Sequence, residues 1–314
     1  AVTVLTEALN EARELRDVEV QRVLLLNLFK FLLEAGELDL AVVRLEEGLA
    51  LAREPQDPYL EGVFLNNLGT VYRLQGDLGA ALKAVSDALA LADRTGIAQH
   101  QIRRRLTLAE NHLDLGDPAE ARVLLLVAQE LSGPDGLGEL HAWHEALLAR
   151  SDLAEGAPSA ALARLADLLH SGLPIDQDDR ARAAWVMGLA ELVLGRPQQA
   201  LRHSAAADLP LDPLLRGWWL SVRLATGPLP DLPDLDDVAS AEELLASRQL
   251  LPLESLGLER ALVSHLAATD QLDRAQAHLQ AAQNRLHQLA ASLNDFPALQ
   301  HSFLDLNRDL NLPA

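Results

Sequence analysis

Apolar residues recur along the chain at intervals of three and four positions, the spacing that places them on one face of an α-helix. Short turns interrupt this pattern at nearly equal intervals of 40, 40, 40 and 39 residues. Each turn carries a glycine, which suits a helix C-cap where the backbone needs a positive φ. The pattern therefore predicts helix pairs joined at Gly36, Gly76, Gly116, Gly156 and Gly195.

An alanine follows each of these glycines five residues later. A small side chain at a fixed place in every repeat is typical of a point where two helices approach closely. We expect these positions to be buried helix contacts. They are Ala41, Ala81, Ala121, Ala161 and Ala200.

Two further units follow less regularly, with turns at Gly227 and Asp270. The sequence thus divides into five regular repeats of about 40 residues over 17–207 and two irregular repeats over 208–296. The second of these regions contains an acidic, proline-rich linker at 227–240. Residues 297–314 are expected to form a short C-terminal capping helix and a tail.

Residues 1–16 align with the second helix of a repeat whose first helix is absent. We expect them to expose an apolar stripe that includes Val4, Leu5, Ala8 and Leu9, where the missing helix would pack. On this interpretation the chain is covalently part of a longer protein.

Residues 65–89 are similar to a tetratricopeptide repeat (TPR). The period of about 40 is longer than the 34 residues usual in that family, so the resemblance is to its long-helix type. Such arrays resemble the C-terminal sensor arrays of bacterial signal-transduction ATPases with numerous domains and of maltose-activator-like transcription regulators. The resemblance implies an all-α, right-handed superhelix of about seven and a half antiparallel helix pairs in a cytoplasmic protein. The residues that carry it are Leu68, Gly69, Tyr72, Gly76, Ala81 and Ala88.

Composition supports an all-helical protein and excludes several partners. Hydrophobic residues make up 49% of the chain and aromatic residues only 4%, with leucine and alanine prominent. The net charge of −20 opposes binding to nucleic acid by this segment. There are no cysteines, which excludes disulfides and thiolate zinc sites, and no apolar run long enough to cross a membrane.

In the family that the repeat resembles, ligands bind the concave surface, which the first helix of each pair lines. Mapping that surface onto this sequence collects cations, amides and tryptophans, which favour an extended acidic or carboxylate-bearing protein segment or peptide. The alternative is that the arginines pair with the surplus acids and that the tryptophans pack between units. The candidate partner-binding residues are Asn27, Lys30, Asn66, Asn67, Thr70, Arg73, Arg103, Thr107, Trp143, Arg150, Arg182, Trp185, Trp218 and Arg260.

Signals for other chemistry are weak. His141 and His144 have a helical spacing that suits a metal pair, but no carboxylate pattern accompanies them. The aspartates at 231–237 lack the glycine and terminal glutamate of a calcium loop, and no nucleotide-binding or hydrolase motif occurs. We therefore expect no cofactor, no metal and no catalysis.

The sequence predicts a non-enzymatic protein- or peptide-interaction module, the sensor or scaffold arm of a larger bacterial signalling or transcription regulator. Three alternatives remain open at this point. They are a receptor for a small signalling peptide or metabolite, a self-associating assembly module, and an enzyme on a helical scaffold.

Overall fold

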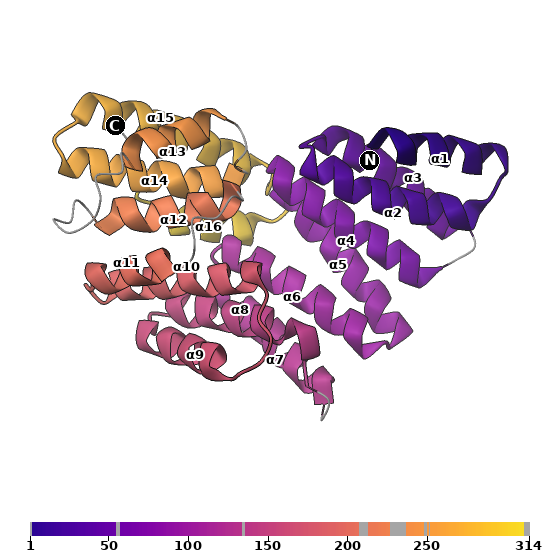
Figure 1. The fold of residues 1–314 in the computed structure, drawn as a ribbon, viewed down its shortest axis with the longest axis horizontal. Helices are drawn as coiled ribbons and strands as arrows, with labels where there is room; N and C mark the ends of the chain where they lie inside the picture. The colour runs from indigo at the N-terminus through magenta and orange to yellow at the C-terminus, as the bar shows by residue number, and fades with distance from the viewer. Residues whose placement is uncertain are drawn as a thin grey trace.

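The computed structural model describes residues 2–54, 57–133, 136–206, 213–226, 237–247, 250 and 252–310. Within these ranges the chain forms α-helices and one short 3-10 helix, with no strand. The all-α superhelix of helix pairs expected from the repeat pattern is confirmed (Figure 1).

The first helices of the pairs carry even numbers. They are α2 (Val18–Glu34), α4 (Pro58–Gln75), α6 (Ala98–Asp114), α8 (His141–Ala154), α10 (Gln177–Val193), α12 (Pro213–Thr226) and α14 (Pro252–Ala268). The 3-10 helix η2 (Gly138–Leu140) leads directly into α8.

The second helices carry odd numbers, and a last helix follows them. They are α1 (Val2–Glu14), α3 (Leu38–Arg53), α5 (Leu78–Thr95), α7 (Pro118–Ser132), α9 (Pro158–His170), α11 (Pro197–Ala206), α13 (Asp237–Ala246), α15 (Leu272–Ala291) and the final α16 (Pro297–Leu306).

The turns between paired helices show why the repeat uses glycine. Gly76 ends α4 with φ of 83°, and its N–H donates to the Arg73 and Tyr72 carbonyls. Asp77 then begins α5 by accepting a hydrogen bond from the Ala80 N–H. The five alanines that follow the turns are all at most 2% exposed, so the predicted helix contacts are confirmed.

The irregular region differs from its expected outline. The helix α13 begins at Asp237, inside the segment predicted as a linker at 227–240. An aspartate in the first turn favours a helix N-terminus, and Ala241 and Leu244 bury their side chains beside Leu220 of α12. Residues 227–236, which hold most of the predicted linker and the turn at Gly227, lie outside the described residues.

The first helix also differs from expectation. Val4 is 67% exposed, but Leu9 is fully buried in a cluster with Leu25 and Leu28 of α2. The prediction that Leu9 belongs to an exposed stripe is therefore wrong. The reason is that α1 turns this edge of its apolar face onto α2, so the next helix in the chain covers it.

The C-terminal helices return to the middle of the chain (Figure 1). Residues of α14–α16 share one apolar core with residues of α5–α8, including Leu82, Leu125, Leu286 and Phe303. The Leu78 N–H donates to the Ser292 Oγ at 3.0 Å, which joins the start of α5 to the end of α15. The superhelix thereby closes on itself. The last helix, α16, packs against the central helices as well as following α15.

Gly79 makes this closure possible. It lies in the first turn of α5, and a Cβ added there would lie 2.1 Å from the Ser292 carbonyl oxygen. The corresponding position holds Asp39 in the preceding repeat and Ala119 in the next. A glycine inside a helix lowers helix stability, and here it allows two backbones to come into contact.

Candidate functional site

A line of polar contacts crosses four consecutive first helices. Arg73 of α4 reaches Asp114 of α6 with Nη2 at 2.7 Å from Oδ2. Arg150 of α8 binds the other oxygen of the same carboxylate, with Nη2 at 2.8 Å from Oδ1. The Arg150 guanidinium in turn lies 5.5 Å from the ring centre of Trp185 on α10. The structure thus joins two of the predicted arginines through one aspartate and places a third predicted residue, Trp185, against one of them.

Asp114 was not among the residues selected from the sequence. Burial by itself would raise the pKa of this carboxyl, but the charges and hydrogen bonds of Arg73 and Arg150 outweigh burial and hold the pKa below its usual range. A signal did exist in the sequence. The position two residues before each turn glycine is expected on the concave face, and Asp114 holds this position before Gly116.

The remaining predicted arginines also pair within the chain. Thus five of the six cations expected on the concave face bind carboxylates of the same chain, as in the alternative interpretation. Lys30 is exposed on α2, outside these pairs. The additional pairs are Arg103–Glu139 at 2.6 Å, Arg182–Asp179 at 2.9 Å and Arg260–Asp309 at 3.0 Å.

The predicted uncharged polar residues divide into two kinds. The Thr70 and Thr107 hydroxyls donate to carbonyls four residues earlier in their own helices, at 3.2 and 3.1 Å. Asn67 is partly exposed on α4, and Asn27 is exposed on α2. The side chain of Trp218 lies outside the described residues.

Four consecutive first helices each hold a covered side-chain atom without a hydrogen-bond partner. These atoms are Asn66 Oδ1 on α4, Asn111 Nδ2 on α6, Trp143 Nε1 on α8 and Arg182 Nε on α10. Three of the four are donors, and burying such a group without a partner costs free energy. Other such atoms among the described residues belong to the ion-paired residues Arg44, Glu259, Arg260 and Arg285.

A small cavity lies beside the Arg73–Asp114 pair. Its walls include Asn111 and Leu253, the latter from the returning helix α14. The volume of about 10 Å³ has room for a single water. Among the residues that the structure describes here, this space fits a water and nothing larger.

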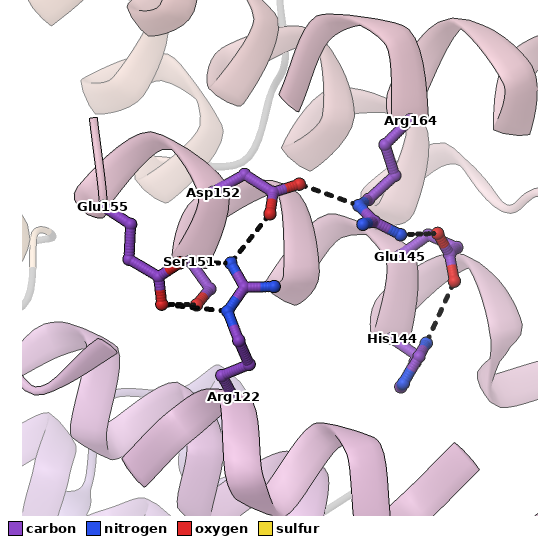
Figure 2. Close-up of polar contacts among 7 residues, drawn as sticks. All are labelled: Arg122, His144, Glu145, Ser151, Asp152, Glu155 and Arg164. Carbon is purple, nitrogen blue, oxygen red and sulfur yellow. Dashed lines mark hydrogen bonds and ion pairs between the residues drawn. The ribbon is translucent and has the colours of Figure 1, made fainter. Parts of the chain in front are cut away.

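A second polar cluster joins α7, α8 and α9 (Figure 2). Arg122 binds Asp152 at 2.7 Å and Glu155 at 2.8 Å. Arg164 binds the second oxygen of Asp152 and also Glu145, each at 3.0 Å. The alternation of charge leaves each guanidinium between two carboxylates.

His144 completes this cluster and is fully buried. Its Nδ1 lies 3.1 Å from Glu145 Oε1, and its Nε2 lies 3.1 Å from the Leu125 carbonyl oxygen. Both ring nitrogens are therefore engaged by the protein. Among the described residues, no group of three or more histidines, aspartates or glutamates is arranged to hold a metal ion.

Glu145 is the carboxylate most affected by the cluster. Burial raises its pKa, but hydrogen bonds from His144 and Arg164 outweigh burial and lower the pKa to about 2. The charged form is thus strongly favoured within this set of partners.

Comparison with known proteins bears on the fold. A family model described as a tetratricopeptide repeat matches residues 61–132, and no curated protein matches the chain. The search for membrane spans over the described helices finds none with the length and apolarity that crossing a bilayer needs.

Several solved structures are similar to the chain. A Rap protein complexed with competence and sporulation factor has a TM-score of 0.67 at 15% identity, covering 91% of this chain and 81% of its own. The apo form of the quorum sensor NprR from B. thuringiensis has a TM-score of 0.56 at 14% identity, covering 99% and 97%. NprR in complex with its cognate peptide NprX has a TM-score of 0.52 at 15% identity, covering 90% and 76%. At these identities the likeness concerns the fold alone, and the fold is a TPR-like superhelix.

Proposed function

We propose that the chain is a non-enzymatic module that binds an extended peptide or protein segment along its first helices. The observation that carries this proposal is the set of four unpartnered atoms on Asn66, Asn111, Trp143 and Arg182, one on each of four consecutive first helices. The four atoms are covered, so a bound segment reaches them only when neighbouring side chains move aside. The carbonyl and N–H groups of a peptide main chain can then satisfy the three donors and one acceptor.

Two of the similar proteins, a Rap protein with competence and sporulation factor and NprR with its cognate peptide NprX, are complexes with a factor or peptide, which agrees with this assignment. By the same likeness, we propose that the module is the sensor or scaffold arm of a larger bacterial signalling or transcription regulator. The water-sized cavity beside Leu253 gives no support to a small metabolite as the ligand.

The charge of the ligand is a separate part of the proposal. Arg73 and Arg150 share Asp114, and Arg182 holds Asp179, so an acidic segment must compete with carboxylates of the chain itself. Binding of an acidic segment would weaken as salt rises, because salt screens the attraction between its carboxylates and these arginines. A ligand that relies on main-chain hydrogen bonds and on Trp185 would respond less to salt.

The test is selection from a random decapeptide display library, followed by titration of the enriched peptides by intrinsic tryptophan fluorescence. Asn67→Ala and Trp185→Phe should lower affinity at least tenfold, because both side chains are partly exposed on first helices. Arg94→Ala, on the exposed side of the second helix α5, is the matched control and should bind as the wild type does. Equal affinity for all four proteins, or the failure to enrich any peptide, would refute the proposal.

A further inference from the structure

Arg104 is a buried cation without a partner among the residues that the structure describes. The residue is only 7% exposed, and no hydrogen bond or ion pair joins it to another described residue. Its two neighbours behave differently, since Arg103 pairs with Glu139 and Arg105 with Asp93. An unpaired guanidinium is unusual in a chain that has 46 acidic and 26 basic residues.

The place of Arg104 in the repeat explains its burial. It lies twelve residues before the turn glycine, where the preceding repeat has Phe64, which is fully buried, and the following repeat has His144. This is a core position of the first helix. His144 meets two acceptors there, whereas Arg104 meets none among the described residues.

A pair of aromatic rings lies one helical turn before Arg104. Tyr59 of α4 stacks on His100 of α6 with ring centres 4.6 Å apart and an angle of 22° between the rings. Tyr59 is 46% exposed, so this pair lies at the surface. His100 lies three and four residues before Arg103 and Arg104 on α6, so the three side chains share one face of the helix. Burial, and then the charges of Arg104 and Arg103, lower the pKa of His100.

The electrostatics of the position favour an anion. Burial, and then the charge of Arg103, lower the pKa of Arg104 to about 10, while Tyr59 acts in the opposite direction. The start of α6 adds to this, because Ile97 supplies no side-chain cap and the first turn holds no acid. Backbone N–H groups at a helix start favour negative charge.

We propose that Tyr59, His100, Arg103 and Arg104 form a binding site for one oxyanion, a phosphate or carboxylate group, at the start of α6. The planar fork of Arg104 can donate two parallel hydrogen bonds to such a group, and the Tyr59 hydroxyl can donate a third. Arg103 contributes charge from the surface, because its partner Glu139 is 70% exposed and can be displaced. Arg103 is also one of the candidate partner-binding residues, but Tyr59, His100 and Arg104 are not, and the test below uses no peptide.

The test measures the melting temperature of the whole chain in inorganic phosphate, in acetate and in chloride at equal ionic strength. At about ten times the dissociation constant, phosphate should raise the wild-type melting temperature by about 2 °C over chloride. A rise in acetate of the same size would identify a carboxylate as an equally good ligand, and a rise in phosphate alone would identify a phosphoryl group.

Variants separate binding from a structural role. Arg104→Met keeps the volume and removes the charge, so it should fold in chloride but lose the phosphate-dependent rise. Tyr59→Phe, which removes only the hydroxyl, should reduce that rise, and the exposed control Arg94→Met should keep it. An equal melting temperature in all three salts for the wild type, or an undiminished phosphate rise in Arg104→Met, would overturn the proposal.

Discussion

Arg104 and His144 occupy equivalent positions in neighbouring repeats, yet their surroundings differ. His144 belongs to a cluster in which three helices supply a partner for each charge (Figure 2). Arg104 is almost as buried but pairs with no carboxylate of the described residues, and the charged or titratable groups that act on its pKa are Arg103 and Tyr59. The repeat scaffold therefore tolerates a polar residue at this core position in two ways, one satisfied by the chain and one open to a ligand.

The satisfied cluster predicts the largest effect. Asp152 is 6% exposed and binds both Arg122 and Arg164, so Asp152→Ala leaves two partly buried guanidiniums with less compensation. We expect a loss of about 3 kcal/mol in the free energy of unfolding, measured by urea denaturation. The control Asp87→Ala breaks an exposed pair with Lys83 and should cost less than about 0.5 kcal/mol. Similar losses for the two variants would show that the buried cluster around Asp152 is no more stabilising than the exposed Lys83–Asp87 pair.

Acid should weaken the same cluster. Because the pKa of Glu145 is lowered to about 2, its contribution is complete above its ordinary value and is lost as the pH falls from about 4.5 toward 2. At neutral pH the wild type should exceed Glu145→Gln by about 2 kcal/mol, and the difference should shrink over this window. Urea denaturation at pH 7 and at pH 3 measures this change, and a difference that does not depend on pH would contradict it.

The closure of the superhelix places α15 against the same central helices. Gly79→Ala should displace Ser292 and cost about 1–2 kcal/mol, although alanine is the better helix former. Gly257→Ala is the matched control, because Gly257 lies within α14 and a Cβ there meets nothing within 4 Å. This control should gain about 0.5–1 kcal/mol in thermal or urea unfolding. A gain at both positions would show that α15 does not press on α5.

The smallest effect is expected at the open position and has the opposite sign to that of Asp152→Ala. In chloride buffer, Arg104→Met should raise the free energy of unfolding by about 1 kcal/mol, because it removes a buried charge that no described residue pairs with. Urea denaturation without phosphate measures this. A loss of stability comparable to that of Asp152→Ala would mean that Arg104 is structurally satisfied.

Much of the fold was predictable because each repeat carries its own local signals. The glycines at the turns, the alanines five residues later and the apolar spacing between them predict helix pairs without knowledge of their neighbours. The candidate site was predictable only in part. Position within the repeat indicated Arg73, Arg150 and Trp185, but it could not show that Asp114 holds both arginines.

The sequence by itself thus determined the helix pairs, the places of the turns and the helix on which each candidate side chain lies. The tertiary structure alone decided which charges are satisfied and where the superhelix closes. The physical reason is the sequence separation between the residues that interact. Helix pairing depends on residues within about 40 positions, whereas the hydrogen bond from Leu78 to Ser292 joins residues 214 positions apart. Whether a buried arginine such as Arg104 finds a carboxylate depends on the packing of separate helices, which no local pattern records.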